Sequence, residues 1–290
     1  MIKAKSVVVL GKFDGVHIAH AKLITTAVDI ASERGAVSLV YSMQKSDSTV
    51  ITEQKIKKDI ITKLGADVVV FKELDHGFMT LSAEEFVKDI IAKELNACCV
   101  VVGENFRFGK NRSAGVCELK GICSTLNIDV VVIDTVHIGD ETVSSTFVKT
   151  LLSKGEVGVV AQYLGRLFTL TGIVTEGKHL GRNLGFPTAN LYPPASCLVP
   201  LNGVYATRVI HQGQTYPSIT NVGVNPTVEE GKNIKVETHV FASVGNWYGE
   251  EITVEFCEFI RSEIRFDNMS ALKSQMEKDK AKAKEFHNII

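Results

Sequence analysis

The stretch SVVVLGKFDGVHIAH, residues 6–20, sets the fold of the first half of the chain. Its opening, residues 6–10, is a short apolar run rich in β-branched side chains, which is typical of a buried parallel strand. A glycine-containing loop follows. Residues 16–34 then carry apolar side chains at helical spacing up to Gly35, a typical residue for ending a helix. The order strand, glycine loop, helix predicts a βα unit with a ligand site at its loop.

The same alternation continues to about residue 133. Further strands are expected at residues 37–41, 67–71, 98–102 and 129–133, with helices at residues 52–64, 82–95 and 116–126. Ser82 and Glu85 have the spacing of a helix-capping box. Alternating strands and helices predict an α/β fold with a parallel sheet covered on both faces, and ligands at the carboxyl ends of the strands.

Two histidines lie at the predicted start of the first helix. His17 and His20 are three residues apart, so both imidazoles can point to one side of the helix. A helix N-terminus favours an anion, and histidines there can donate hydrogen bonds to a phosphate during its transfer. Two ordinary polar histidines on a solvated turn are the alternative that this spacing leaves open.

The second half of the chain has an all-β pattern until its last helix. Short β-type runs occur at residues 168–174, 203–210, 215–220, 235–241 and 251–256, separated by turns with Gly, Asn and Pro. This spacing predicts an antiparallel barrel. The change of pattern places a domain boundary near residue 160, giving domains 1–160 and 161–290. A charged amphipathic helix is expected up to His287, with Ser270 as its N-cap.

The stretch GKHLGRNLGFPTAN, residues 177–190, is a candidate site for phosphate and metal. Glycines spaced four apart allow backbone N–H groups to seat an anion, and two cations between them add positive charge. Thr188 and Asn190 offer the hard oxygens that Mg²⁺ prefers, and Pro187 fixes the backbone just before them. A glycine-rich β-turn with incidental charges is the alternative.

These motifs resemble those of one protein family. Residues 177–190 are similar to the ATP and Mg²⁺ loop of riboflavin kinases, and residues 11–20 resemble the Gly-x-Phe-Asp-Gly-x-His-x-Gly-His signature of nucleotidyltransferases. Residues 103–109, GENFRFG, match the FMN adenylyltransferase domain. The chain as a whole resembles the two-domain bacterial riboflavin kinase/FMN adenylyltransferases, also called FAD synthetases.

The resemblance implies both the fold and the chemistry. It implies a nucleotidyltransferase-type, Rossmann-like parallel sheet, followed by a six-stranded antiparallel Greek-key barrel with a terminal helix. It also implies ATP- and Mg²⁺-dependent phosphorylation of riboflavin to FMN, followed by adenylylation of FMN to FAD. The expected small-molecule partners are therefore ATP, riboflavin and FMN.

Residues that match the family's motifs receive its roles. Glu237, on a predicted strand and in an apolar setting, would be the base of the kinase, and the two histidines would act in adenylyl transfer. Arg261 would bind flavin, while Thr188 and Asn190 would hold the metal ion. The residues expected to bind ATP are Gly11, Phe13, Asp14, Gly15, Asn105, Ser145, Thr146, Gly177, Lys178, Gly181, Arg182, Gly185, Pro187 and Asn221.

Three departures from the nucleotidyltransferase pattern leave an alternative open. Ala19 replaces the last glycine of the signature, so its side chain would crowd the ATP phosphates. Residues 41–45, Tyr-Ser-Met-Gln-Lys, stand where the family has Phe-x-Pro-His-Pro with an ATP-binding histidine. Phe147 and Lys149 stand where the family has two arginines. The alternative is a riboflavin kinase whose first domain has a binding or regulatory role. A flavin or nucleotide carrier without catalysis is a third interpretation.

Composition limits the other classes of function. Lys plus Arg number 32 against 33 Asp plus Glu, a net charge of −1 that argues against a general nucleic-acid binder. No apolar run approaches the ~20 residues that span a bilayer. The six cysteines have no Cys-x-x-Cys or metal spacing and are expected to be reduced. Met1 leads almost directly into a strand, without a signal peptide. A cytoplasmic protein that is monomeric or weakly homo-oligomeric is therefore expected.

Overall fold

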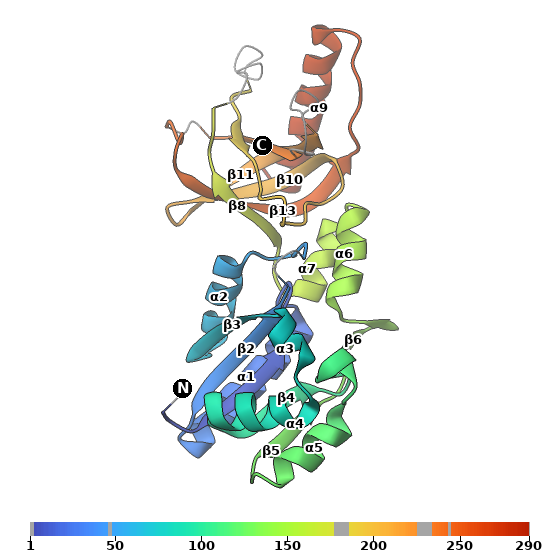
Figure 1. Ribbon diagram of the computed structural model, residues 1–290. Coiled ribbons are helices and arrows are strands. Elements are labelled where there is room, and N and C mark those ends of the chain that lie inside the picture. Colours follow the sequence, from blue (N-terminus) through green and yellow to red (C-terminus); the bar gives the residue numbers. More distant parts are fainter. Residues whose placement is uncertain (1–2, 46–47, 177–185, 225–233, 243–244, 290) are drawn as a thin grey trace. The chain divides into compact units, whose positions relative to one another are not determined.

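The computed structural model describes residues 3–45, 48–176, 186–224, 234–242 and 245–289. They form two compact units, Met1–Ser145 and Thr146–Ile290, each with its own sheet (Figure 1). The boundary expected near residue 160 lies within helix α7 (Val157–Leu164). This helix packs against strand β13 (Glu251–Arg261) of the second unit.

The first unit is built on a parallel five-stranded sheet with strand order β3-β2-β1-β4-β5. The strands are β1 (Ser6–Gly11), β2 (Val37–Gln44), β3 (Val68–Glu73), β4 (Ala97–Gly103) and β5 (Asp129–Ile133). The helices are α1 (Ile18–Arg34), α2 (Gln54–Lys63), α3 (His76–Thr80), α4 (Ala83–Glu85), the π-helix η1 (Phe86–Glu94), the 3-10 helix η2 (Lys110–Arg112) and α5 (Val116–Ser124). A small hairpin of β6 (His137–Ile138) and β7 (Glu141–Thr142) follows. The predicted parallel α/β fold is confirmed.

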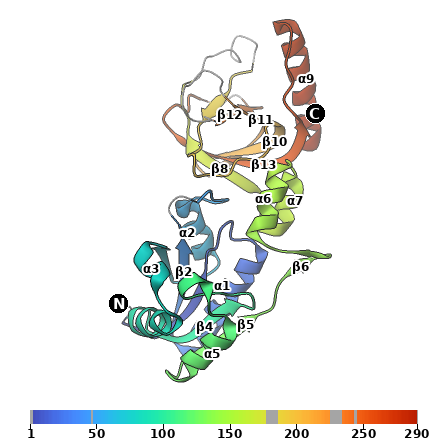
Figure 2. The ribbon, with the colours of Figure 1, turned by 45° about the vertical axis from the view of Figure 1, so that its right-hand side comes forward.

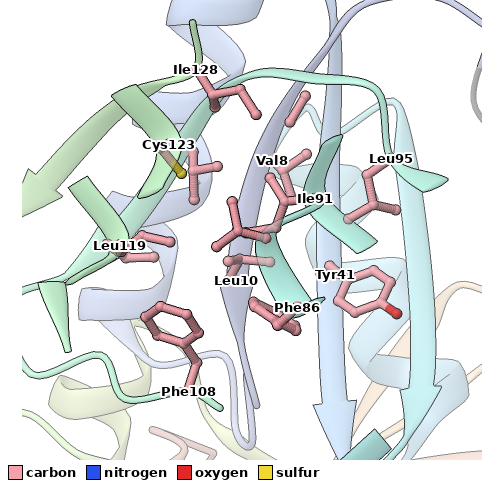
Figure 3. Packing of buried hydrophobic residues seen from close by; sticks show 14 of the residues in the cluster. Val8, Leu10, Tyr41, Phe86, Ile91, Leu95, Phe108, Leu119, Cys123 and Ile128 are labelled. Atoms are coloured by element: carbon pink, nitrogen blue, oxygen red, sulfur yellow. The ribbon is translucent and has the colours of Figure 1, made fainter. Parts of the chain in front are cut away.

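Both faces of this sheet are covered, which explains the unbroken apolar run in β1. Val8 and Leu10 belong to a core with side chains of η1 and α5, shown in Figure 3. Val7 and Val9 belong to a second core with side chains of α1. Successive side chains of a strand point to opposite faces, so a strand covered on both sides is apolar throughout.

Local signals at the helix ends of this unit are confirmed. Gly35 ends α1 in the left-handed conformation, with φ of 59°. In the capping box, Ser82 Oγ accepts a hydrogen bond from Glu85 N at 3.2 Å, and Glu85 Oε2 accepts one from Ser82 N at 2.8 Å. The helix expected to run on to residue 95 has α-helical hydrogen bonding only in α4 and continues as the π-helix η1.

The second unit carries a six-stranded antiparallel sheet with order β8-β13-β10-β11-β12-β9. Besides β13, its strands are β8 (Phe168–Ile173), β9 (Ala189–Leu191), β10 (Gly203–His211), β11 (Gln214–Val224) and β12 (Ile234–Val240), and Figure 2 shows β12 next to β11. A bridge between Thr175 and Asn190 joins β9 to the segment that follows β8, which draws the two edges of the sheet together. The predicted six-stranded architecture is confirmed, and the three-residue β9 is the strand that periodicity missed.

Among the residues that the structure describes, the helices of the second unit are α6 (Ser145–Ser153), α7 and α9 (Met269–Phe286). Helix α9 packs against β10 and β11. Its expected N-cap, Ser270, is wrong. Asn268 caps the helix, because its side-chain oxygen accepts a hydrogen bond from Ala271 N at 2.9 Å. No helix that the structure describes is long and apolar enough to cross a membrane.

Four buried hydroxyl groups form a chain inside the second sheet. Thr207 Oγ1 lies 2.8 Å from Ser218 Oγ and 2.7 Å from Thr220 Oγ1, and Thr220 Oγ1 lies 2.9 Å from Thr238 Oγ1. All four residues are fully buried. Because each hydroxyl can both donate and accept, the chain satisfies polar groups that would otherwise be costly in the interior.

Candidate functional site

Three predicted site residues form one row across the second sheet. In the antiparallel register, Asn221 of β11 lies opposite Glu237 of β12, and Glu237 lies opposite Asn190 of β9. Directly opposed residues project from the same face of a sheet. The register therefore brings together the residues predicted as base, ATP-binding residue and metal ligand, from three strands that are far apart in the sequence.

A cavity of about 330 Å³ lies at this face of the second unit. Its lining includes four predicted site residues, Thr188, Asn221, Glu237 and Arg261. Residues that the sequence analysis did not single out complete the lining, among them Glu263, Ile264 and Phe266 after β13, and Leu272, Met276 and Asp279 of α9. The volume lies at the lower end of the range for small-molecule sites.

Asn190 presents a side-chain oxygen suited to a cation. Its Oδ1 is buried and has no hydrogen-bond partner within the described residues, while its main-chain carbonyl accepts a hydrogen bond from Thr175 N at 2.9 Å. Buried polar atoms are normally paired, so an orphaned oxygen here favours a ligand that the chain itself does not supply. Thr188 lies two residues earlier and lines the cavity. These hard oxygens fit Mg²⁺.

The setting of Glu237 is more polar than the sequence suggested. Its side chain is 36% exposed, and Oε1 accepts a hydrogen bond from Lys235 Nζ at 2.6 Å. The expected apolar setting is wrong because Lys235, two positions earlier on the strand, projects from the same face. The ion pair orients the carboxylate beside the cavity.

Arg261 is held by an acidic residue that the sequence analysis missed. Its Nε donates to both carboxylate oxygens of Asp279 at 3.0 Å, and its Nη2 donates to Oδ2 at 2.6 Å. The two side chains are only 18% and 4% exposed, and Gln275 Nε2 donates a further hydrogen bond to Asp279 Oδ1 at 2.8 Å. This pair ties α9 to the end of β13 at the edge of the cavity.

His239 supports the segment that carries Thr188. Its Nδ1 lies 2.9 Å from the carbonyl oxygen of Pro187. A carbonyl can only accept, so Nδ1 carries the proton of this hydrogen bond. Burial of the imidazole lowers the pKa of His239, which favours the neutral ring. Pro187, predicted as an ATP-binding residue, is thus anchored to β12 just before the predicted metal ligand.

In the first unit, the two predicted histidines are stacked at the start of α1. The ring centroids of His17 and His20 lie 3.6 Å apart, with 14° between the ring planes. His17 is the N-cap of α1, because its Nδ1 accepts a hydrogen bond from His20 N at 3.3 Å. The Nε2 of a neutral His17 therefore carries the proton. Burial, followed by the charges of His17 and Lys57, lowers the pKa of His20.

The loop before these histidines is fixed by hydrogen bonds from neighbouring segments. The carbonyl oxygen of Lys12 accepts from Ser42 Oγ at 3.0 Å and from Lys57 Nζ at 3.3 Å. The Oδ1 atom of Asp14 accepts from Ile51 N at 2.7 Å. These contacts preorganise the loop that connects β1 to α1.

Close packing and backbone geometry explain the remaining loop residues. A Cβ on Gly11 would lie 3.0 Å from the ring of Phe13, which is fully buried, and Gly15 has φ of 83°. Ser145 Oγ donates a hydrogen bond to the carbonyl oxygen of Asp14 at 2.7 Å. The predicted residues Gly11, Phe13, Asp14, Gly15 and Ser145 therefore lie together with the histidine pair.

Other predicted residues are dispersed or lie outside the described chain. Asn105, beyond the carboxyl end of β4, is exposed and donates from Nδ2 to Thr135 Oγ1 at 3.2 Å. Thr146 begins the second unit, and the ring of Phe147 packs 5.0 Å from that of Tyr163. The predicted phosphate seat lies outside the described residues; its members are Gly177, Lys178, Gly181, Arg182 and Gly185.

The chain therefore has two separate candidate sites, a histidine pair at the first helix of a parallel sheet and an Asn–Glu–Asn row beside a cavity on an antiparallel sheet. Residues 1–147 match the family model described as FAD synthetase, and residues 164–287 match the one described as riboflavin kinase. The chain belongs to the bifunctional riboflavin kinase/FMN adenylyltransferase family.

Relatives with this name match along nearly the whole chain. The bifunctional riboflavin kinase/FMN adenylyltransferase of Bacillus subtilis is 33% identical, over 97% of this chain and 92% of the relative. That of Escherichia coli K12 is 30% identical, over 98% and 93%. A solved structure from Streptococcus pneumoniae, described as a macrolide-efflux protein, matches with a TM-score of 0.89 and 27% identity, covering 97% of this chain and 94% of that one.

Proposed function

We propose that the chain carries out two consecutive steps of flavin cofactor synthesis. The second unit transfers the γ-phosphate of ATP to riboflavin and yields FMN and ADP. The first unit transfers AMP from ATP to FMN and yields FAD and pyrophosphate. The observation that carries this proposal is the row of Asn221, Glu237 and Asn190 at a cavity of about 330 Å³.

In the kinase step, Glu237 accepts the proton of the terminal ribityl hydroxyl while that oxygen attacks the γ-phosphorus in line with the departing ADP oxygen. Its ion pair with Lys235, at 2.6 Å, holds the carboxylate at the cavity wall. Thr188 and Asn190 would hold Mg²⁺, which supplies neutralising charge to the phosphates. His239 keeps Thr188 in place through Pro187.

In the adenylyl step, the first unit binds the triphosphate and stabilises the departing pyrophosphate. The N-terminus of α1 favours negative charge, and the protonated Nε2 of His17 can donate a hydrogen bond to a phosphate oxygen. The anchored loop of residues 11–15 holds this geometry before the substrate arrives, because its main-chain carbonyls are already bonded to Ser42, Lys57 and Ser145. An FMN phosphate oxygen attacks the α-phosphorus, and the bond to pyrophosphate breaks.

A riboflavin kinase with a degenerate first domain is the less favoured function, since both domain models match and the named relatives are bifunctional. The departures at Ala19, Phe147 and Lys149 do not remove the histidine pair or the anchored loop. We place the activity in the cytoplasm, because the spacing of the six cysteines is that of neither a Cys-x-x-Cys pair nor a metal site and they are expected to be reduced. We propose a monomer or weak homo-oligomer without nucleic acid.

Product analysis tests the proposal directly. The chain is incubated with riboflavin, ATP and Mg²⁺, or with FMN in place of riboflavin, and the flavins are separated by chromatography. FMN and FAD are expected from riboflavin, and FAD from FMN. Glu237→Gln should abolish FMN formation and leave FAD formation from FMN intact, whereas Glu258→Gln, at an exposed strand position outside the cavity lining, should change neither. A Glu237→Gln variant that still phosphorylates riboflavin at the native rate would refute the assignment of the base.

A further inference from the structure

A lysine is buried in the first unit beside the predicted adenylyl-transfer loop. Lys57 of α2 is 1% exposed and is among the largest fully buried side chains of the chain. Its Nζ donates to Gln44 Oε1 at 2.8 Å and to the carbonyl oxygen of Lys12 at 3.3 Å. Burying an ammonium group is costly and calls for strong polar partners. The burial of this ammonium group beside the loop therefore indicates a role in a ligand site.

The contact with Lys57 fixes the orientation of the Gln44 amide. An ammonium group only donates, so the atom of Gln44 that faces it is the oxygen, and the Nε2 atom presents two hydrogens elsewhere. Within the part of the chain that the structure describes, no acceptor binds this Nε2. Gln44 is half-buried and ends strand β2.

The location of Gln44 matches a ligand edge. Strand β2 is the parallel neighbour of β1, and ligands of such sheets lie at the carboxyl ends of the strands. Position 44 is also where the family motif described above has its histidine, so a neutral amide donor here takes the place of an imidazole. The loop that Lys57 holds through Lys12 leads directly to His17 and His20.

The charge of Lys57 reaches the histidine pair. It contributes, after burial and His17, to the lowered pKa of His20. A fixed positive charge close to the start of α1 adds to the helix N-terminus in favouring a polyanion.

We propose that Gln44 and Lys57 form a cation–amide pair that binds the triphosphate of ATP in the adenylyl-transfer site. Gln44 Nε2 donates to a phosphate oxygen. Lys57 is a positioning residue that orients this amide, anchors the 11–15 loop and supplies buried positive charge. The inference rests on the proposed adenylyltransferase function and adds two residues to it.

The test uses the full chain and three variants. Gln44→Ala removes the amide donors, Lys57→Met removes the charge but keeps an unbranched side chain, and Lys58→Met, at an exposed position of the same helix, is the matched control. FAD formation from FMN is measured at varied ATP. Riboflavin phosphorylation in the same preparations reports on the second unit.

Gln44→Ala and Lys57→Met are each expected to raise the KM for ATP in FAD formation about 10- to 100-fold, because each removes a hydrogen bond to a charged group. The double variant should raise it no further than the larger single effect, since the two residues act as one unit. The rate of riboflavin phosphorylation should be native in all variants, and Lys58→Met should keep the native KM for ATP in FAD formation. A purely structural role would instead lower the folded fraction and leave the KM for ATP at its native value, and Gln44→Ala with a native KM overturns the proposal.

Photolabelling with 8-azido-ATP, followed by peptide mapping, separates this inference from the proposed activity. If the native chain makes no FAD but is labelled within residues 1–145, the proposed adenylyl transfer is refuted. The proposed pair is still tested in that case, because it predicts weaker labelling of Gln44→Ala and Lys57→Met. Equal labelling of native chain and variants, or no label on residues 1–145 of the native chain, overturns the proposed pair.

Discussion

The ion pair between Arg261 and Asp279 can be broken from one side or removed altogether, and the two changes should have very different effects. Replacing Asp279 by leucine leaves the guanidinium of Arg261 buried, with three hydrogen bonds of 2.6–3.0 Å lost. Side-chain exposures of 18% and 4% leave little access for water to compensate. Breaking a buried pair in this way costs about 3–5 kcal/mol, which for a unit of this size lowers Tm by roughly 6–20 °C.

The double variant Arg261→Met/Asp279→Leu serves as the matched control. It replaces both charged groups by apolar ones, and such replacements are often neutral or stabilising. Its free energy of unfolding should therefore lie within about 1 kcal/mol of the native value. The resulting double-mutant cycle gives a coupling energy of several kcal/mol between the two residues.

The chain contains a natural reporter for this measurement. Trp247 is its only tryptophan, is 9% exposed and packs 4.5 Å from the ring of His211 in the second unit. Urea unfolding followed by tryptophan fluorescence therefore reports on that unit. A loss below about 1 kcal/mol in Asp279→Leu, or a double variant as unstable as the single one, would refute the reasoning. The riboflavin KM of the double variant then shows whether Arg261 also binds flavin.

Three further predictions concern the two units separately. Thr220→Val should destabilise the second unit by about 1–3 kcal/mol in urea unfolding, because the buried hydroxyl of Thr238 loses its partner and Thr207 keeps only Ser218. Asn190→Ala should raise the Mg²⁺ concentration required for FMN formation at least about tenfold, while FAD formation from FMN stays native; equal Mg²⁺ dependence in native and variant would contradict its role as a ligand. Because the pKa of His20 is lowered in the folded state, the unfolded chain binds more protons between the folded and unfolded pKa. The contribution of His20 to the free energy of unfolding is therefore complete above pH 6.5 and is lost as the pH falls towards the lowered folded pKa. In calorimetry, the unfolding temperature of the first unit should depend less on pH in His20→Gln than in the native chain within that window. An unchanged pH dependence would contradict a pKa of His20 lowered by burial.

Sequence patterns predicted those parts of the fold that depend on neighbouring residues. The apolar run of β1, the glycine that ends α1 and the capping box at Ser82 are each encoded within a few positions. Where a signal was weak, it failed: the three residues of β9 show no periodicity, and Asn268 rather than Ser270 caps α9. Asn268 and Ser270 are both suitable capping residues two positions apart, and they differ only in which side chain reaches an unpaired backbone N–H at the start of the helix.

The candidate sites divide in the same way. The residue types of the histidine pair and of the segment with Thr188 and Asn190, which we propose as metal ligands, could be predicted from spacing, chemistry and family resemblance. Lys57 lies four residues before the buried Ile61 on α2, and this spacing places both on the same face of the helix. Nothing in the sequence shows which atoms accept hydrogen bonds from the Lys57 ammonium group. Asp279 is one of many charged residues along α9, and only packing against β13 distinguishes it from the others.

The sequence by itself therefore determined the two kinds of sheet, the helix ends of the first unit and the chemical types of the site residues, because these depend on side-chain period and local hydrogen bonding. The tertiary structure alone decided that Asn221, Glu237 and Asn190 stand in one row, that Arg261 is paired with Asp279, and that a lysine is buried behind the loop of residues 11–15. Strand register and burial join residues distant in the sequence, and both are set by how whole elements pack.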